Sequence, residues 1–281
     1  MASTEHVARQ VEALNALGDV DLATLGQLVA DSGWNQTADD WALFATQGSI
    51  YVVRDADRRI VASGAVLPMG AKAAWISMVL VTPGARGQGV GRQVFAHCLE
   101  VVRQSGRTAM LDATPAGEAL YRQFDFSPLW RLTRWQRAAQ PATSPALHRE
   151  SIDLDALAAL DADALGFARR AVLEDLADRE GSRLLRRANG FAIVRAGRIA
   201  HQIGPLLATS EAAAAALLGD AAARLAGPVF VDVPDDRPAL REWLAGAGFT
   251  TQRSFARMAA GADAPEGQRS FIHAIAGPEF G

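Results

Sequence analysis

The sequence predicts an α+β fold that is built twice in tandem. The same order of helical and strand patterns occurs before and after residues 138–149. The stretches "LDATPAGEALYRQFDF" and "VDVPDDRPALREWLAGAGF" both place an acidic residue after a strand, and then a helix that ends near a phenylalanine. Measured from Phe126 to Phe249, the repeat is 123 residues long. We therefore expect two related units in one chain.

The domain boundaries follow from length and composition. A chain of 281 residues suits one large domain or two of average size, and 49% hydrophobic with 21% charged residues is typical of a folded globular protein. The segment 138–149, "AAQPATSPALHR", is rich in alanine, proline and small polar residues and has no periodicity. We interpret it as a linker between a first domain over 1–137 and a second over 150–281.

Charge and hydropathy argue against several classes of partner. The formal net charge is −3 and no long basic block is present, so we expect no nucleic-acid partner. The longest apolar runs are interrupted, for example at Asp220 and Arg224, and fall short of the ~20 residues of a membrane span. A single cysteine, Cys98, and a start without signal-peptide character predict a cytoplasmic protein. We expect it to be either a monomer or a homodimer.

The first half is expected to contain helices over 21–33 and 37–48, the second opened by Thr37 and Asp40 as a capping signal. Two strands follow within 49–67 around the polar turn "RDADRR", and a third runs over 73–81. A helix over 89–106, a strand over 108–114, a helix over 116–124 and a final run over 126–137 complete this half.

The second half repeats this order. Helices are expected over 154–166 and 167–181, and three strands within 182–208, joined at Asn189-Gly190 and Ala196-Gly197. A helix over 210–227, a strand over 228–234, a helix over 237–248 and a closing run over 253–261 follow.

The glycine-rich stretch "VTPGARGQGVGR" (81–92) follows an apolar strand and opens a helix. A nucleotide P-loop requires Lys and Ser or Thr after the last glycine, where this chain has Arg92 and Gln93. A dinucleotide fingerprint requires a third glycine that is missing here, although Asp112 lies near the place of a ribose-binding acid. Because three strands precede the glycines, the position also argues against a dinucleotide fold.

The same stretch is suited to bind an anion. Glycines remove the side chains that would block a diphosphate, and the backbone N–H groups of 87–92 point toward it. The positive end of the helix dipole adds attraction, and Arg86 and Arg92 supply charge nearby.

The pattern Arg86-x-x-Gly89-x-Gly91 resembles the acyl-CoA signature of the GCN5-related N-acetyltransferase (GNAT) superfamily, and residues 20–137 follow that family's element order. The resemblance implies domains that each have a mixed, mostly antiparallel sheet flanked by helices, with acetyl-CoA as co-substrate and no metal. It also implies that the strand before the motif splays from its neighbour and pairs with the pantetheine arm. The residues that it implies for CoA binding are Val79, Leu80, Val81, Arg86, Gly87, Gln88, Gly89, Val90, Gly91, Arg92 and Thr114.

Tyr121 is the candidate catalytic acid. In the family a tyrosine in a pattern like "LYxxxGF" protonates the departing thiolate, and "LYRQFDF" matches with Asp125 in place of glycine. The alternative is a packing tyrosine. The general base stays unassigned, because the strand 73–81 carries no glutamate; a water chain, Asp112 or an already neutral amine are the options.

The stretch "GWNQTADDW" lies between the first two helices, which wall the acceptor pocket in the family. Trp34, Asn35 and Gln36 are therefore the candidate substrate-pocket residues, whereas Trp41 suits the pocket and the core equally. His97 and Cys98 are interpreted as packing or surface residues.

The second half lacks the residues of the motif. It has "IGPLLATSEAAA" in place of "VTPGARGQGVGR", and Leu244 where the first half has Tyr121, so we expect no CoA binding there. This comparison also predicts that the fold can form the turn without its glycines. The chain resembles tandem acetyltransferases with a C-terminal domain of the YitH/HolE type. The stretches that carry this resemblance are "GWNQT", "LDATPAG", "LDADALGFARR", "IGP" and "GPEFG". The second domain then shapes the acceptor site or serves for stability.

The expected activity is transfer of an acetyl group from acetyl-CoA to the amine of a small molecule or peptide, by direct attack in a ternary complex. Two alternatives remain: a CoA-binding sensor or pseudoenzyme, which the missing strand glutamate favours, and a purely structural tandem scaffold. The sequence identifies neither the amine nor the acyl chain length.

Overall fold

The computed structural model describes residues 10–145, 154–261 and 263–281. The first half contains β1 (Val11–Ala13), α1 (Asp19–Asp31), α2 (Ala38–Gln47), β2 (Ser49–Arg54), β3 (Ile60–Met69), β4 (Ala73–Val81), η1 (Pro83–Ala85), α3 (Val90–Gln104), β5 (Thr108–Ala113), α4 (Pro115–Arg122) and β6 (Phe126–Arg137). The second half contains α5 (Leu154–Leu165), α6 (Arg170–Asp178), β7 (Arg183–Arg187), β8 (Gly190–Arg195), β9 (His201–Ala208), α7 (Glu211–Ala222), β10 (Val229–Pro234), α8 (Pro238–Gly246), β11 (Thr250–Ala260), η2 (Arg269–Phe271) and β12 (Ile272–Ala274).

The expected α+β class and the repeated element order are confirmed. The capping box at Thr37 and Asp40 is present, with the Thr37 backbone N–H donating to the Asp40 carboxylate at 2.7 Å. Sequence reasoning missed the strands β1 and β12, since each is too short to show a period. The described part of the linker, 138–145, has no helix or strand and is held to the end of α7, where the Thr143 N–H bonds the Ala223 carbonyl; residues 146–149 lie outside the described residues.

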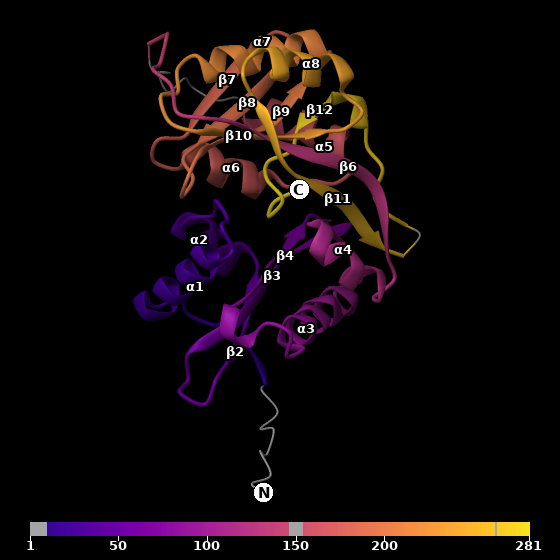
Figure 1. Ribbon diagram of the computed structural model, residues 1–281. Helices are drawn as coiled ribbons and strands as arrows, with labels where there is room; N and C mark the ends of the chain where they lie inside the picture. The colour runs from indigo at the N-terminus through magenta and orange to yellow at the C-terminus, as the bar shows by residue number, and fades with distance from the viewer. Residues whose placement is uncertain (1–9, 146–153, 262) are drawn as a thin grey trace, which may run out of the picture.

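The two halves share a single sheet. Its strand order is β1-β2-β3-β4-β5-β11-β6-β10-β9-β8-β7, and the short β12 pairs with β9. The last long strand of each half therefore pairs with the next-to-last long strand of the other half: β11 lies beside β5, and β6 lies beside β10 (Figure 1). All strand pairs in it are antiparallel except β4 with β5 and β9 with β10. The expected pair of separate sheets is thus replaced by one that crosses between the halves.

Two buried ion pairs join the exchanged strands to their neighbours. Arg257 of β11 lies opposite Asp112 of β5 and binds it through Nε (2.9 Å) and Nη2 (2.8 Å). Arg134 of β6 lies opposite Asp232 of β10 and binds it in the same two-pronged way, at 2.7 Å for each contact. The two pairs are related by the sequence repeat. Since an unpaired buried charge is costly, each pair stabilises the exchanged strands in this register.

Three apolar cores stabilise the molecule. The central core joins α1 and α2 of the first half to α5 and α6 of the second. A second core lies between α3 and the sheet of the first half, and a third lies under α7 and α8. In Figure 1 the two halves stack with α1 and α2 facing α6, and the C-terminal segment enters the space between them. The halves are therefore bound by apolar burial as well as by strand exchange.

Candidate active site

Strands β4 and β5 separate from each other toward the site. They pair only at residues 73–75 and 108–110, and beyond Trp75 the strands splay apart. A bulge in β4 opposite β3 places Met78 at a φ of 54°, and the Ser63 hydroxyl donates to the Met78 carbonyl at 2.8 Å. The resulting opening presents the β5-facing backbone groups of β4 to a ligand.

The glycine-rich turn follows directly and has backbone reasons for its glycines. Gly87 and Gly89 adopt φ values of 74° and 77°, a left-handed conformation that favours glycine. A Cβ on Gly91 would lie 3.1 Å from Val81 Cγ2, so this glycine lets α3 approach β4 closely. The first turn of α3 receives no side-chain cap at Gly89, so its N–H groups face the opening.

The second half does not form a comparable turn. Only Thr209 and Ser210 lie between β9 and α7, whereas residues 82–89 lie between β4 and α3. In the 123-residue repeat Gly204 corresponds to Val81, the last residue of β4, but Gly204 lies inside β9. The expectation that the fold builds the same turn without glycines was therefore wrong, because β9 continues and enters α7 almost directly.

A cleft of about 580 Å³ extends from the splayed strands along the turn. It brings together every residue expected to bind CoA except Gln88, whose side-chain amide donates to the Gly84 carbonyl at 2.8 Å. Arg86 bonds the Val81 carbonyl at 3.1 Å, and the guanidinium of Arg92 stacks on Phe124 at 4.6 Å. Both guanidiniums thus lie at the edge of the cleft, held beside the turn.

A smaller chamber of about 40 Å³ lies deeper, where the two halves meet. Its volume is enough for about three waters. The first half contributes Trp34, Gln36, Ile76, Ser77, Met78, Val79, Leu111, Asp112, Thr114 and Tyr121. The exchanged strands and the C-terminal segment contribute Arg134, Arg253, Phe255, Pro278 and Glu279. The chamber therefore exists only when the two halves are together.

Cleft and chamber share a wall. The residues that line both are Trp34, Val79, Asp112, Thr114 and Tyr121. The Tyr121 ring packs on Phe95 at 4.5 Å, and Gly117 leaves room for it, since a Cβ there would lie 2.9 Å from the ring. Burial raises the pKa of Tyr121 above its usual value, so the phenol keeps its proton at neutral pH. The Thr114 hydroxyl caps α4 by accepting from the Gly117 N–H at 3.3 Å, and its own proton stays available to a ligand.

Glu279 is an acidic residue of the chamber that sequence reasoning missed. Its carboxylate accepts from Arg195 Nη2 and from Gln36 Nε2, both at 2.8 Å. Burial raises the pKa of Glu279 above that of an ordinary carboxyl group, and the positive charge of Arg195 opposes this rise. The other acid of the chamber, Asp112, has both oxygens engaged by the cationic Arg257, whereas one oxygen of Glu279 accepts only from the neutral amide of Gln36. Glu279 is therefore better suited to accept a further proton.

Two of the aromatic and amide candidates have other roles. Asn35 lines neither hollow: its amide donates to the Ala200 carbonyl, and its oxygen accepts from the N–H groups of Ile199 and Ala200, all at 3.0 Å. It thus clamps a loop of the second half. Trp41 is 1% exposed and belongs to the central core. Trp34 and Gln36, by contrast, do line the chamber.

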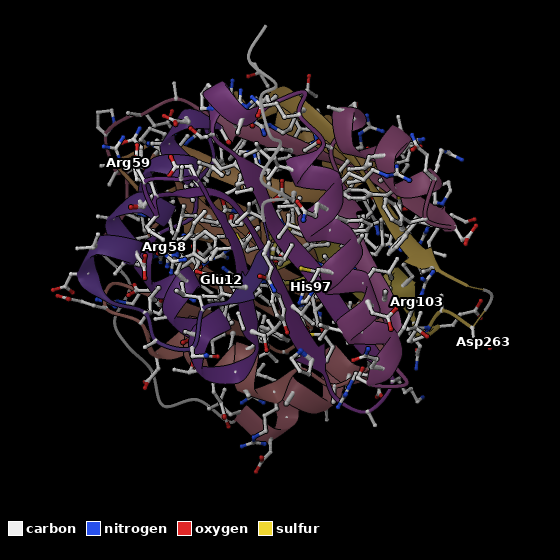
Figure 2. The ribbon with its side chains drawn as sticks, turned by 90° about the horizontal axis from the view of Figure 1, so that it is seen from below. Glu12, Arg58, Arg59, His97, Arg103 and Asp263 are labelled. Atoms are coloured by element: carbon white, nitrogen blue, oxygen red, sulfur yellow. The ribbon has the colours of Figure 1, made fainter. Side chains whose placement is uncertain are left out.

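The residues on the far part of α3 lie outside both hollows. Figure 2 shows His97 and Arg103 on this helix, with Glu12 of β1 beside Arg58 of the β2–β3 turn. His97 contacts the ring of Tyr51 at 4.6 Å. Cys98 is fully buried, and burial raises the pKa of its thiol to about 12, so it has no thiolate character at neutral pH.

Comparisons with known proteins agree with this geometry. Residues 46–128 match one family model and residues 157–274 match another, and both are described as acetyltransferase (GNAT) domains; together they span more than half of the chain. The chain belongs to the GNAT superfamily. With two acetyltransferase domains it is an acyltransferase. The chain is also similar to a holothin acyltransferase from Pseudoalteromonas sp. (strain SANK 73390), at 27% identity over 243 residues that cover 79% of this chain and 78% of that protein.

Solved structures show the same GNAT fold in tandem. A crystal structure assigned to an acetyltransferase from Pyrococcus horikoshii has a TM-score of 0.81 at 23% identity, covering 100% of this chain and 99% of that one. A tandem GNAT protein from the clavulanic acid biosynthesis pathway has a TM-score of 0.60 at 18% identity, covering 90% and 99%. Within the described ranges, no helix is both long and apolar enough to cross a membrane.

The second GNAT half has no open cleft at the equivalent place. Strands β9 and β10 pair only at 201–203 and 229–231 and then separate, as β4 and β5 do. Here β12 pairs antiparallel with β9, and the N–H of the next residue, Ile275, bonds the Asp232 carbonyl at 3.0 Å. The chain itself therefore fills the opening that is a cleft in the first half.

The chamber residues of the second GNAT half could not be assigned from sequence, because their placement depends on the strand exchange. One signal was present for the ion pairs: the repeat that relates Phe126 to Phe249 also relates Arg134 to Arg257. The repeat gives no comparable signal for Glu279, since the segment after β12 has no counterpart in the first half; the "GPEFG" end that contains Glu279 carried a resemblance but assigned this residue no role.

Proposed function

We propose that this acyltransferase moves an acetyl group from acetyl-CoA to a primary amine by direct attack in a ternary complex. The observation that carries this proposal is the meeting of two hollows at Tyr121. The long cleft leads from the glycine-rich turn to the splay of β4. Beyond the wall that they share lies the smaller chamber, which we assign to the amine and call the amine chamber. A thioester at the shared wall would face a bound amine.

The residues of the cleft fit acetyl-CoA. The uncapped N–H groups at the start of α3 suit the diphosphate, with Arg86 and Arg92 beside them. The extended pantetheine arm of CoA suits the splay between β4 and β5, since an extended segment of the chain, β12, fills the equivalent opening of the second half. Acetyl-CoA supplies the activated thioester carbonyl when it is bound.

The residues of the chain divide the proton transfers between them. Glu279 accepts the proton that the amine loses as its nitrogen bonds to the carbonyl carbon. The backbone N–H of Val79, a residue that lines both hollows at the splay, donates to the carbonyl oxygen. As the carbon–sulfur bond breaks, Tyr121 donates its proton to the sulfur. The products are an amide and free CoA thiol.

A CoA-binding sensor without activity was favoured by the missing glutamate in β4. Glu279 removes that support, because it brings a carboxylate to the chamber from the other half. Incubation with acetyl-CoA and a panel of primary amines, followed by thiol detection, separates the two functions. Tight CoA binding without amine-dependent thiol release would favour the sensor. The similarity to a protein named as a holothin acyltransferase supports acyl transfer over the sensor function.

Substitution of Tyr121 by phenylalanine is expected to lower kcat by about 10- to 100-fold, because one hydrogen bond to a developing charge is lost. The measurement is steady-state thiol release at saturating acetyl-CoA. The matched control is Tyr51→Phe, which changes the other tyrosine of the chain, a buried one that contacts His97. Equal rates in both variants would reduce Tyr121 to a packing residue.

Substitution of Gly89 by aspartate is expected to weaken CoA binding at least tenfold, since a carboxylate would face the diphosphate. Calorimetric titration with CoA measures this. Gly181→Asp is the control, because Gly181 has the same φ of 77° and equally open surroundings in an exposed turn of the second half. If both variants bind CoA like the parent chain, the turn is not the diphosphate site.

A further inference from the structure

The amine chamber contains buried polar groups without partners. Gln36 is 7% exposed, and its Nε2 is committed to Glu279, which fixes the amide with its Oε1 as a free acceptor. Ser77 Oγ, also in the chamber wall, has no hydrogen-bond partner within the described residues. Because buried polar atoms are nearly always satisfied in folded proteins, these two atoms point to a polar ligand.

The chamber also contains an uncompensated positive charge. Arg253 follows a bulge in β11 and lies directly opposite Arg134. Arg134 is neutralised by Asp232, whereas Arg253 makes no ion pair or hydrogen bond with any part of the chain that the structure describes. Burial lowers the pKa of Arg253, and the positive charge of Arg134 lowers it further, against the attraction of Asp232. Two like charges on facing strands are unfavourable unless an anion joins them.

The fold itself does not require this arginine. In the repeat, Trp130 of β6 is the counterpart of Arg253 of β11, just as Arg134 is the counterpart of Arg257. In the sheet, Arg253 lies opposite Arg134, and its counterpart Trp130 lies opposite Arg257. On that side the tryptophan stacks on the Arg257 guanidinium at 4.4 Å and no like-charge pair arises. The position thus accepts an aromatic residue in one half and carries a free guanidinium only where it lines the chamber.

We propose that the acceptor is a small amine that also carries a carboxylate. This inference rests on the proposed acyl transfer and names its substrate class. Arg253 binds the carboxylate, while Gln36 Oε1 and Glu279, which line the same chamber, receive the amine. The guanidinium fork matches a carboxylate in shape and charge, and the small volume of the chamber favours a compact acceptor.

The test uses matched acceptor pairs: glycine and glycinamide, β-alanine and β-alaninamide, 4-aminobutanoate and 4-aminobutanamide. For each, kcat/KM is measured with acetyl-CoA and corrected for the fraction of unprotonated amine. We expect the parent enzyme to prefer at least one acid over its amide by on the order of 10- to 100-fold. Arg253→Gln should bring this preference close to one, and Arg253→Lys should retain part of it.

The control is Arg241→Gln, which removes a half-buried arginine of α8 outside both hollows and should leave the preference unchanged. Binding of the same compounds to enzyme saturated with CoA, followed by ligand-observed NMR, gives a readout without turnover. Thiol release with amides as fast as with acids overturns this inference and leaves acyl transfer intact. Arg253-dependent binding of an acid without thiol release supports the carboxylate site at Arg253 and contradicts acyl transfer. No Arg253-dependent binding of any acid overturns it.

Discussion

Replacement of Glu279 by glutamine is expected to lower kcat by on the order of 10²–10⁴, the range of general base catalysis, while acetyl-CoA still binds. The variant keeps the size of the side chain and its bond to Gln36, but it cannot accept a proton from the amine. Stopped-flow thiol release at saturating acetyl-CoA and amine measures the chemical step, and calorimetric titration with CoA checks that the cleft is intact.

The pH dependence of the same step gives a second readout. A base must be deprotonated, so the rate falls as pH drops through the pKa of Glu279. Burial raises this pKa, so the acidic limb of the pH–rate profile should fall at a higher pH than it would for an ordinary carboxyl group. This limb should vanish in Glu279→Gln. The limb that comes from protonation of the amine substrate should remain in both proteins.

A purely structural role for Glu279 makes a different prediction. Glu279→Gln leaves Arg195 without its buried partner, and the double variant with Arg195→Met removes that unpaired charge. If the double variant recovers the parent rate, Glu279 acts only by pairing Arg195. If the rate stays low while stability returns, the carboxylate itself is needed.

Replacement of Arg257 by methionine is expected to lower the free energy of unfolding by about 3–5 kcal/mol, because it leaves the carboxylate of Asp112 buried and unpaired. The loss should exceed that of a surface ion pair for a second reason. The Arg257 guanidinium lies between the rings of Trp75 and Trp130, at 4.7 and 4.4 Å, and those contacts disappear too. Urea unfolding at pH 7 measures the change.

The effect of pH on this variant has a defined sign. Burial raises the pKa of Asp112, and Arg257 opposes that rise. Without Arg257 the pKa in the folded state rises further above that in the unfolded state, so the folded variant gains stability as pH falls and the carboxyl group is protonated. The deficit relative to the parent chain should therefore be largest at neutral pH and shrink on acidification.

Two further variants limit the interpretation. Arg170→Met removes an arginine whose ion pairs with Asp155 and Glu174 lie on the surface, and it should change the free energy of unfolding far less than Arg257→Met. Adding Asp112→Leu to Arg257→Met should restore much of the lost stability, because no unpaired charge remains. A deficit that is unchanged by this addition, and independent of pH, would mean that lost packing rather than the buried carboxylate sets the cost.

The glycine-rich turn shows how far local sequence reaches. Positive φ values at Gly87 and Gly89 and the close contact at Gly91 are local requirements, so the residue types alone predicted the turn and its place before α3. The same holds for the capping box at Thr37 and for the repeated order of elements. Tyr121 was also found by its local pattern, and the structure places it between the two hollows.

The sequence by itself determined the helices, strands and turns within each unit of the repeat. Hydrophobic periodicity, helix caps and turn residues depend only on residues that are close together in the chain. Only the tertiary structure decided which strands pair between the halves, since β6 and β11 read equally well as the last strand of their own unit. That pairing brings Arg253 and Glu279 to the chamber from far along the chain. The physical reason is that strand pairing joins residues far apart along the chain, which no local pattern encodes: Asp112 and Asp232 are buried, and each is neutralised by an arginine from the other half.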